Sequence, residues 1–133
     1  MYFATGAVTG ATGAVAIWGR GGRPATYPRV RLAAGTAIPA GGTLLFRYPT
    51  EADPCILVRL ASGQLAAYSQ VCTHLSCAVY YSKAESKLLC PCHRGAFDLV
   101  NGAPTGGPPT RPLPRIIVEQ RGETLVAIRK EAR

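Results

Sequence analysis

The chain predicts an all-β domain built from antiparallel sheets, and three observations carry this prediction. Short runs rich in β-branched and aromatic residues recur from about residue 27 onward, and Gly and Pro separate these runs. No stretch of this region repeats its apolar residues with a convincing helical period. The length of 133 residues suits one domain. Regularly spaced short strands are typical of an antiparallel sandwich or barrel.

The first 19 residues stand apart because they carry no charge and are mostly small, apolar or aromatic. Nineteen such residues can just cross a hydrocarbon core as a helix. Gly6 and Gly10 form a small-xxx-small pattern that lets another helix pack closely, and Trp18 lies where interfacial aromatic residues occur. We therefore expect residues 1–19 to be a transmembrane anchor. A signal peptide is the weaker interpretation, since no basic region precedes the apolar run. A buried soluble helix is the other alternative.

Residues 20–28 follow as a segment rich in Gly and Pro, which cannot continue a helix and makes a poor strand. We expect a tether, or alternatively an ordered loop packed on a partner. The net charge of +8 includes a basic group around this segment, formed by Arg20, Arg23, Arg29 and Arg31. Lipid headgroups beside the anchor explain this group better than nucleic acid does, because basic and aromatic residues do not interleave.

The β domain is expected from residue 29 to residue 133, and its strands follow in chain order. The expected strands are residues 29–33, 43–48, 55–60, 64–68, 87–89, 115–119 and 124–128. The last two pair naturally around the turn at 120–123. Cys55 begins an apolar run, so we expect it to be a core residue.

Two short segments carry the chemistry of the chain. Residues 72–77 read CTHLSC and residues 90–93 read CPCH, so each offers one Cys and one His as ligands and holds one further Cys. Zinc modules favour separate C-x₂₋₄-C and H-x₃₋₅-H pairs. Mixed pairs better suit a two-iron cluster in which one iron takes two thiolates and the other takes two imidazoles. A structural zinc module is the alternative.

The spacing of both segments, with a Pro between the cysteines of the second, resembles the Rieske iron–sulfur proteins. The resemblance implies a [2Fe-2S] cluster whose first iron is bound by Cys72 and Cys90. The second iron would be bound by His74 and His93.

The further cysteine in each segment points to one branch of that family. The resemblance implies a disulfide between Cys77 and Cys92, as in the high-potential branch found in cytochrome bc complexes and some molybdenum oxidoreductases. Rieske ferredoxins and oxygenases usually lack it. Such a crosslink suits ligand loops that have little core of their own, because it restricts their opening.

The resemblance also implies a Rieske fold, in which a base of antiparallel sheets carries a cluster-binding insertion at about residues 71–112. The Pro- and Gly-rich stretch 102–114 would contain a proline loop that covers a third side of the cluster. Proline has no N–H donor, so it shields the sulfides without hydrogen bonds. A plain surface loop is the alternative. The residues expected beside the cofactor, in addition to its ligands, are Leu75, Gly95, Phe97 and Pro108.

One departure from the family pattern concerns the residues after the second segment. High-potential members commonly continue His-Gly-Ser-x-Tyr, where the Ser hydroxyl bonds a bridging sulfide and the Tyr hydroxyl bonds a ligand thiolate. Gly95 and Phe97 stand at those places here, so neither bond can form. Losing both bonds lowers the reduction potential, which suits a donor such as menaquinol. Arg94 partly offsets this loss if it lies near the cluster.

The function that the resemblance implies is electron transfer in a membrane quinol-oxidising complex of cytochrome bc type. The chain would accept one electron from quinol, with a proton on His74 or His93, and pass the electron to a cytochrome. The expected partners are cytochrome b-type and c-type subunits, quinol and the lipid bilayer, without nucleic acid. The alternatives are a relay subunit of a molybdenum oxidoreductase resembling arsenite oxidase and a soluble Rieske ferredoxin.

The expected location is the cell membrane, with a single span and the β domain outside the cytoplasm. Basic residues after a span favour the cytoplasmic side, whereas a stable disulfide favours an oxidising compartment. We give the disulfide more weight. No Arg-Arg motif precedes the span, so the sequence does not indicate an export route.

Overall fold

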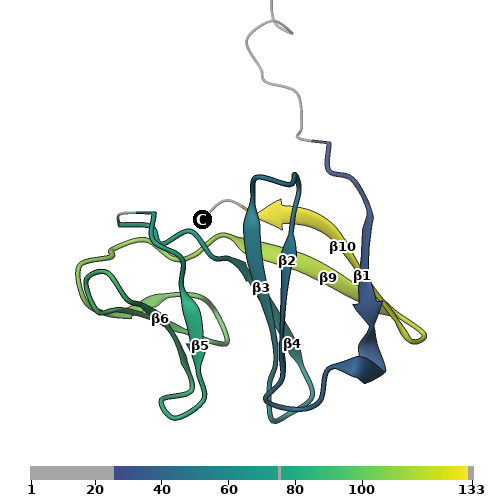
Figure 1. Cartoon of the computed structure of the whole chain (residues 1–133), viewed down its shortest axis with the longest axis horizontal. Coiled ribbons are helices and arrows are strands. Elements are labelled where there is room, and N and C mark those ends of the chain that lie inside the picture. Colours follow the sequence, from purple (N-terminus) through teal and green to yellow (C-terminus); the bar gives the residue numbers. More distant parts are fainter. Residues whose placement is uncertain (1–25, 75, 132–133) are drawn as a thin grey trace, which may run out of the picture.

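A computed structural model describes residues 26–74 and 76–131, which form two antiparallel β-sheets (Figure 1). The larger sheet has the strand order β1-β10-β9-β4-β3-β2, and the smaller sheet has the order β5-β6-β7-β8. Within these residues the helical part is the single 3₁₀ turn η1 (Gly35–Ala37), and no helix is long and apolar enough to cross a bilayer. The all-β prediction is confirmed. The predicted anchor and all but three residues of the predicted tether lie outside the described residues.

The larger sheet is assembled from both ends of the β domain. Its strands are β1 (Val30–Ala34), β2 (Thr43–Arg47), β3 (Pro54–Arg59), β4 (Leu65–Ser69), β9 (Arg115–Arg121) and β10 (Thr124–Glu131). Each was predicted from its apolar and β-branched residues, and each lies within three residues of its predicted ends. The final hairpin is confirmed, because Thr124 pairs with Arg121 across the turn at Gly122.

The smaller sheet is inserted between β4 and β9, and in Figure 1 its strands β5 and β6 lie to one side of the larger sheet. Its strands are β5 (Tyr80–Ser82), β6 (Lys87–Cys90), β7 (Gly95–Asp98) and β8 (Pro104–Gly106). Only β6 was predicted. Of the other three, β7 and β8 contain Gly together with Asp or Pro, which are depleted in strands. β5 consists of only three residues, which is too short to show an alternating pattern. The sheet lies inside the predicted insertion at 71–112.

Two hydrophobic cores lie on opposite faces of β3 and β4. Side chains alternate between the faces of a strand, so Cys55 and Leu57 enter one core while Ile56 and Val58 enter the other. The first core is formed mainly by side chains of the larger sheet, such as Leu125. The second core joins the larger sheet to the smaller one and contains Leu88, Phe97, Leu99 and Leu113. The inserted sheet is therefore packed directly against the base.

Cys55 is a core residue, as predicted. It is buried at 1% exposure, and its Sγ lies 3.2 Å from the carbonyl oxygen of Tyr48. Burial raises the pKa of the Cys55 thiol to about 11, because the apolar surroundings disfavour the thiolate. The thiol is therefore protonated at neutral pH and is a poor nucleophile.

Tyr68 on β4 connects the base to the inserted segment. Its hydroxyl donates to the carbonyl oxygen of Leu99 at 2.9 Å, and the guanidinium of Arg115 lies 5.8 Å from its ring centroid. Gly102 packs on the same ring: its φ is +73°, and a Cβ there would lie 2.7 Å from Cε1 of Tyr68. This close packing fixes the start of the Pro-rich segment against the larger sheet.

The packing of Gly102 predicts a difference between two glycine substitutions. Gly63 also has a positive φ, +92°, but nothing lies within 4 Å of a Cβ built on it. Gly63→Ala should cost about 1–2 kcal/mol of unfolding free energy, the usual penalty of a left-handed alanine. Gly102→Ala should cost more, since it adds the contact with Tyr68. Chemical denaturation measures both, and equal losses would contradict the assigned contact.

Candidate metal centre

The second ligand loop is the turn of the β6–β7 hairpin. Cys90 ends β6 and pairs directly with Gly95, which begins β7, so residues 91–94 form the connection. Arg94 closes this turn with a φ of +58°, in the left-handed region. The hairpin keeps the Cys90 thiol in the second core at 3% exposure, whereas His93 is exposed. The strand end therefore holds a buried thiol and the turn presents an imidazole to solvent.

The first ligand loop is closed by its own backbone. The backbone N–H of Cys72 donates to the carbonyl oxygen of Cys77 at 2.8 Å, and that of Ser76 donates to the carbonyl oxygen of Cys72 at 3.0 Å. A bridge between Val71 and Ala78 forms the base of the loop. Cys72 is buried at 3% exposure and His74 is exposed. Both loops thus place a thiol inside and an imidazole outside.

The fold brings the two exposed imidazoles close together. The ring centroids of His74 and His93 lie 5.3 Å apart, with the ring planes perpendicular. The two thiols, Cys72 and Cys90, belong to one core cluster. A set of two buried thiols and two exposed imidazoles is the donor chemistry of a mixed-ligand [2Fe-2S] cluster. The residues present therefore fit that cofactor, with the imidazole side facing solvent.

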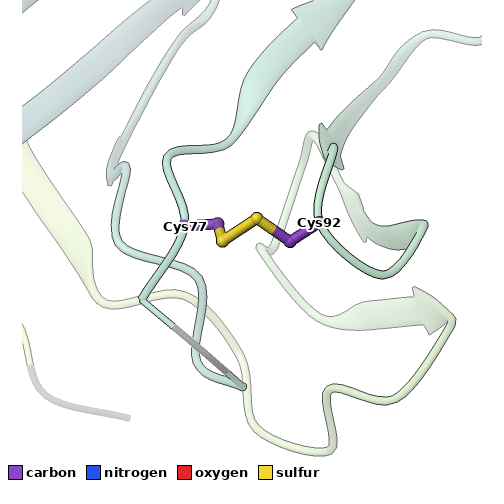
Figure 2. The surroundings of a disulfide bond; sticks show 2 residues. All are labelled: Cys77 and Cys92. Carbon is purple, nitrogen blue, oxygen red and sulfur yellow. A yellow bond between two sulfur atoms is a disulfide. The ribbon is translucent and has the colours of Figure 1, made fainter.

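A disulfide joins the two ligand loops, as Figure 2 shows for Cys77 and Cys92. Their Cα atoms lie 6.3 Å apart, within the usual range for a disulfide. The predicted pairing is confirmed. The sulfur atoms of Cys77, Cys90 and Cys92 all lie within 4.8 Å of one another. Two of the three form the disulfide, whereas Cys90 is outside it and is buried.

The Pro-rich segment is attached to the first ligand loop by a reciprocal pair of hydrogen bonds. The Thr73 hydroxyl donates to the carbonyl oxygen of Arg111 at 2.8 Å, and Nη2 of Arg111 donates to the carbonyl oxygen of Thr73 at 3.3 Å. Sequence reasoning missed this pair, because 38 residues separate its members and neither belongs to a recognisable motif. The contact fixes the residue that precedes His74.

The residues predicted beside the cofactor differ in how far they are buried. Gly95 and Phe97 are buried, and Phe97 packs in the same core as Cys72 and Cys90. Pro108 is exposed, whereas its neighbour Pro109 is buried. Leu75 lies outside the described residues. Gly95 and Phe97 have no hydroxyl, so the two donors common in high-potential members are absent from this buried side of the site.

A depression of about 460 Å³ beside His74 carries mixed charge. Arg111 and Lys130 supply positive charge, and Asp53 supplies negative charge. The side-chain hydrogen bond from Thr50 holds the pKa of Asp53 below its usual value, so this carboxylate stays ionised into acid conditions. The exposed His74 therefore borders a polar, charged surface.

Comparison with a protein-family model identifies residues 32–120 as a Rieske [2Fe-2S] domain. The chain is 39% identical over 83 residues to a protein of Haloferax mediterranei named as a respiratory nitrate reductase Rieske subunit, covering 61% of this chain and 37% of that protein. It is 39% identical over 69 residues to the Rieske subunit of the Corynebacterium glutamicum cytochrome bc1 complex, covering 49% and 17%. The chain thus spans well under two thirds of these relatives.

Among solved structures, the chain is similar to the cyanobacterial plasma membrane Rieske protein of Synechocystis PCC 6803. The two share 31% sequence identity and a TM-score of 0.66, covering 75% of this chain and 99% of that one.

The disulfide predicts a specific loss of stability when it is removed. The double variant Cys77→Ala, Cys92→Ala should lose about 3 kcal/mol of unfolding free energy, the usual effect for a crosslink closing a loop of 15 residues. It should also release its cluster faster. Cys55→Ala is the matched control, because it removes a thiol that is buried in the other core and belongs to neither loop. Denaturation and visible absorbance measure both effects, and a disulfide-free variant as stable as the control would contradict the role assigned to the bond.

Proposed function

The chain belongs to the Rieske [2Fe-2S] family of electron-transfer proteins, and from this premise we propose that it is the Rieske subunit of a membrane quinol-oxidising complex of cytochrome bc type. The observation that supports this proposal best is the pair of adjacent exposed imidazoles, His74 and His93, together with the disulfide between their loops.

We propose that the cluster is held by four side chains. Cys72 and Cys90 supply the buried thiolates, and His74 and His93 supply the exposed imidazoles. Burial of both thiols and exposure of both imidazoles support this division. The cluster, when bound, takes up and releases one electron at a potential above that of all-Cys clusters.

The imidazoles carry the proton side of the proposed reaction. An outward ring nitrogen of His74 or His93 accepts a hydrogen bond from the quinol hydroxyl and then holds the proton that leaves with the electron. Both rings are exposed and adjacent, so a flat hydroxyl-bearing molecule can reach either one. The missing hydroxyls at Gly95 and Phe97 support a lower-potential donor such as menaquinol.

The remaining parts of the proposal concern the membrane. The uncharged residues 1–19 would anchor the chain by a single span, and residues 20–28 would tether the domain outside the cytoplasm, beside cytochrome b-type and c-type subunits. The relative in a cytochrome bc1 complex supports this setting. The disulfide supports an oxidising compartment.

A second candidate function is the electron-relay subunit of a molybdenum oxidoreductase. The alignment with the nitrate reductase Rieske subunit favours it, since it covers 61% of this chain against 49% for the cytochrome bc1 subunit. In such an enzyme the cluster only relays electrons, and no quinol needs to reach the imidazoles.

Purification of the full-length tagged chain with its native partners separates the two candidates. The proposed function predicts co-purification of a cytochrome b-type subunit from detergent-solubilised membranes. A molybdopterin-containing subunit in its place would establish the second candidate and overturn the first. The cysteine pair Cys77/Cys92 counts against a soluble ferredoxin, which would purify without either partner.

The ligand assignment predicts the composition and spectrum of the site. The protein should contain two irons and two sulfides and show, when reduced, the low average g-value of a cluster with nitrogen ligands. Cys72→Ser or Cys90→Ser should abolish that signal, whereas Cys55→Ser should keep it. Iron and sulfide analysis with EPR spectroscopy measures these outcomes. A colourless protein with stoichiometric zinc would refute the assignment.

The proposed proton transfer predicts how the midpoint potential depends on pH. If His74 and His93 take up protons on reduction, higher pH disfavours reduction and the midpoint falls. The fall should reach about 59 mV per pH unit where one proton accompanies one electron. Protein-film voltammetry from neutral to strongly alkaline pH measures this slope. A midpoint that stays constant over the whole range would remove the proton-accepting role of the imidazoles.

A further inference from the structure

Three cysteine sulfurs lie together between the two ligand loops, and two of them are bonded to each other. The disulfide crosses from Cys77 in the first loop to Cys92 in the second (Figure 2). The Sγ of Cys90 lies within 4.8 Å of both sulfurs of this bond. A thiol beside a disulfide can exchange with it, because its sulfur attacks one sulfur of the bond and the other sulfur leaves. The site thus holds a nucleophile and its target in one place.

Packing keeps Cys90 in this position. Its side chain is buried at 3% exposure in the second core, and Cys77 packs against the same core. Cys90 also ends β6, where its backbone pairs with that of Gly95. Holding two reactants together replaces a bimolecular encounter with an intramolecular step, which is much faster. Within the part of the chain that the structure describes, Cys72 and Cys55 do not belong to this group of sulfurs.

The exposure of the three side chains indicates which sulfur Cys90 attacks. Cys92 is exposed, whereas Cys77 is half-buried. Attack on the Cys77 sulfur releases the Cys92 sulfur into solvent, where water stabilises the departing thiolate. Attack on the Cys92 sulfur would instead close a very short ring through Pro91, whose fixed φ restrains such a loop. The favoured product is therefore a Cys77–Cys90 bond with Cys92 as a thiol.

We propose that Cys90 is the nucleophile of an internal thiol–disulfide exchange that takes place when this residue holds no metal. The Cys90 thiol loses its proton and its sulfur attacks Sγ of Cys77. The Cys77–Cys92 bond breaks, and the Cys92 thiolate takes up a proton. One disulfide is present before and after the step, so no oxidant or reductant is consumed. The inference rests on the proposed function, in which Cys90 is a cluster ligand.

The exchange couples the pairing of the cysteines to the occupancy of the metal centre. When Cys90 holds iron, its sulfur is engaged in that bond and does not attack the disulfide. When Cys90 holds no iron, the exchange converts this ligand into half of a Cys77–Cys90 bond. That bond still joins the two loops, but an exchanged chain lacks one of the four proposed ligands. It cannot bind the cluster until Cys90 is released again.

Disulfide mapping of the full-length chain in detergent, before and after metal removal, tests the exchange. A chelator removes the iron without air or reductant, and released sulfide is removed by desalting. Samples are taken over minutes to hours, the usual time of uncatalysed exchange, and their thiols are blocked with N-ethylmaleimide in mild acid. The holoprotein should keep the Cys77–Cys92 crosslink throughout. The apoprotein should gain a Cys77–Cys90 crosslink and a blocked Cys92, while its thiols remain three in number.

Two variants that each lose one proposed ligand provide the matched comparison. Cys72→Ser removes a thiol outside the sulfur group and leaves Cys90 beside the disulfide. Cys90→Ser removes the nucleophile itself. Neither variant can hold the cluster, so both are mapped as purified, without reductant. Cys72→Ser should contain the Cys77–Cys90 crosslink, whereas Cys90→Ser should contain only the Cys77–Cys92 crosslink.

Three results would overturn the inference: an unchanged Cys77–Cys92 bond in the apoprotein, a new bond between Cys90 and Cys92, or rearrangement that persists in Cys90→Ser. If a variant does not accumulate, the chelated parent protein decides the outcome by itself. Iron and sulfide are counted on the parent protein before the chelator is added. A parent protein that never holds two irons and two sulfides refutes the proposed function. A normal cluster without exchange after its removal refutes only the exchange.

Discussion

The disulfide between Cys77 and Cys92 is the connection on which the metal centre depends. The site needs donors from two loops that lie far apart in the sequence and extend toward solvent. Neither loop has a large core of its own, since their outer residues, including His74 and His93, are exposed. A covalent bond restricts how far the loops separate, whether or not a cluster is bound. The two imidazoles therefore remain neighbours, with ring centroids 5.3 Å apart.

The Pro-rich segment completes this arrangement by contacting both loops in different ways. Reciprocal hydrogen bonds between Thr73 and Arg111 hold it to the first loop. Close packing of Pro109 against Gly95 holds it to the second. Each of the three segments is thus connected to the other two, and the ring of Tyr68 fixes the start of the Pro-rich segment on the base. The larger sheet therefore supports the loops, while the candidate ligands stay on the loops themselves.

The sequence predicted the strands of the larger sheet and named candidate ligands in two segments. It did not predict the contacts that hold these two segments together. Strands such as β3 can be predicted from sequence because they are runs of apolar and β-branched residues, which are buried on both faces of the sheet. The strands β7 and β8 form because neighbouring backbones pair with them, although their Gly, Pro and Asp residues are uncommon in strands. β5 is too short, at three residues, to show a pattern. The disulfide followed from family resemblance. The pairing of Thr73 with Arg111, and the burial of Pro109 in place of Pro108, depend on tertiary packing that no local pattern encodes.

The central claim is that one imidazole from each loop binds the same iron, while the buried thiols bind the other. Pulsed EPR spectroscopy of the reduced protein, grown with ¹⁵N-labelled histidine, tests it most directly. The chain contains two histidines, so any strongly coupled histidine nitrogen must come from His74 or His93. The account predicts two strongly coupled ¹⁵N nuclei, and one fewer when either histidine is replaced. A reduced cluster with no coupled ¹⁵N, or with only one, would contradict the account.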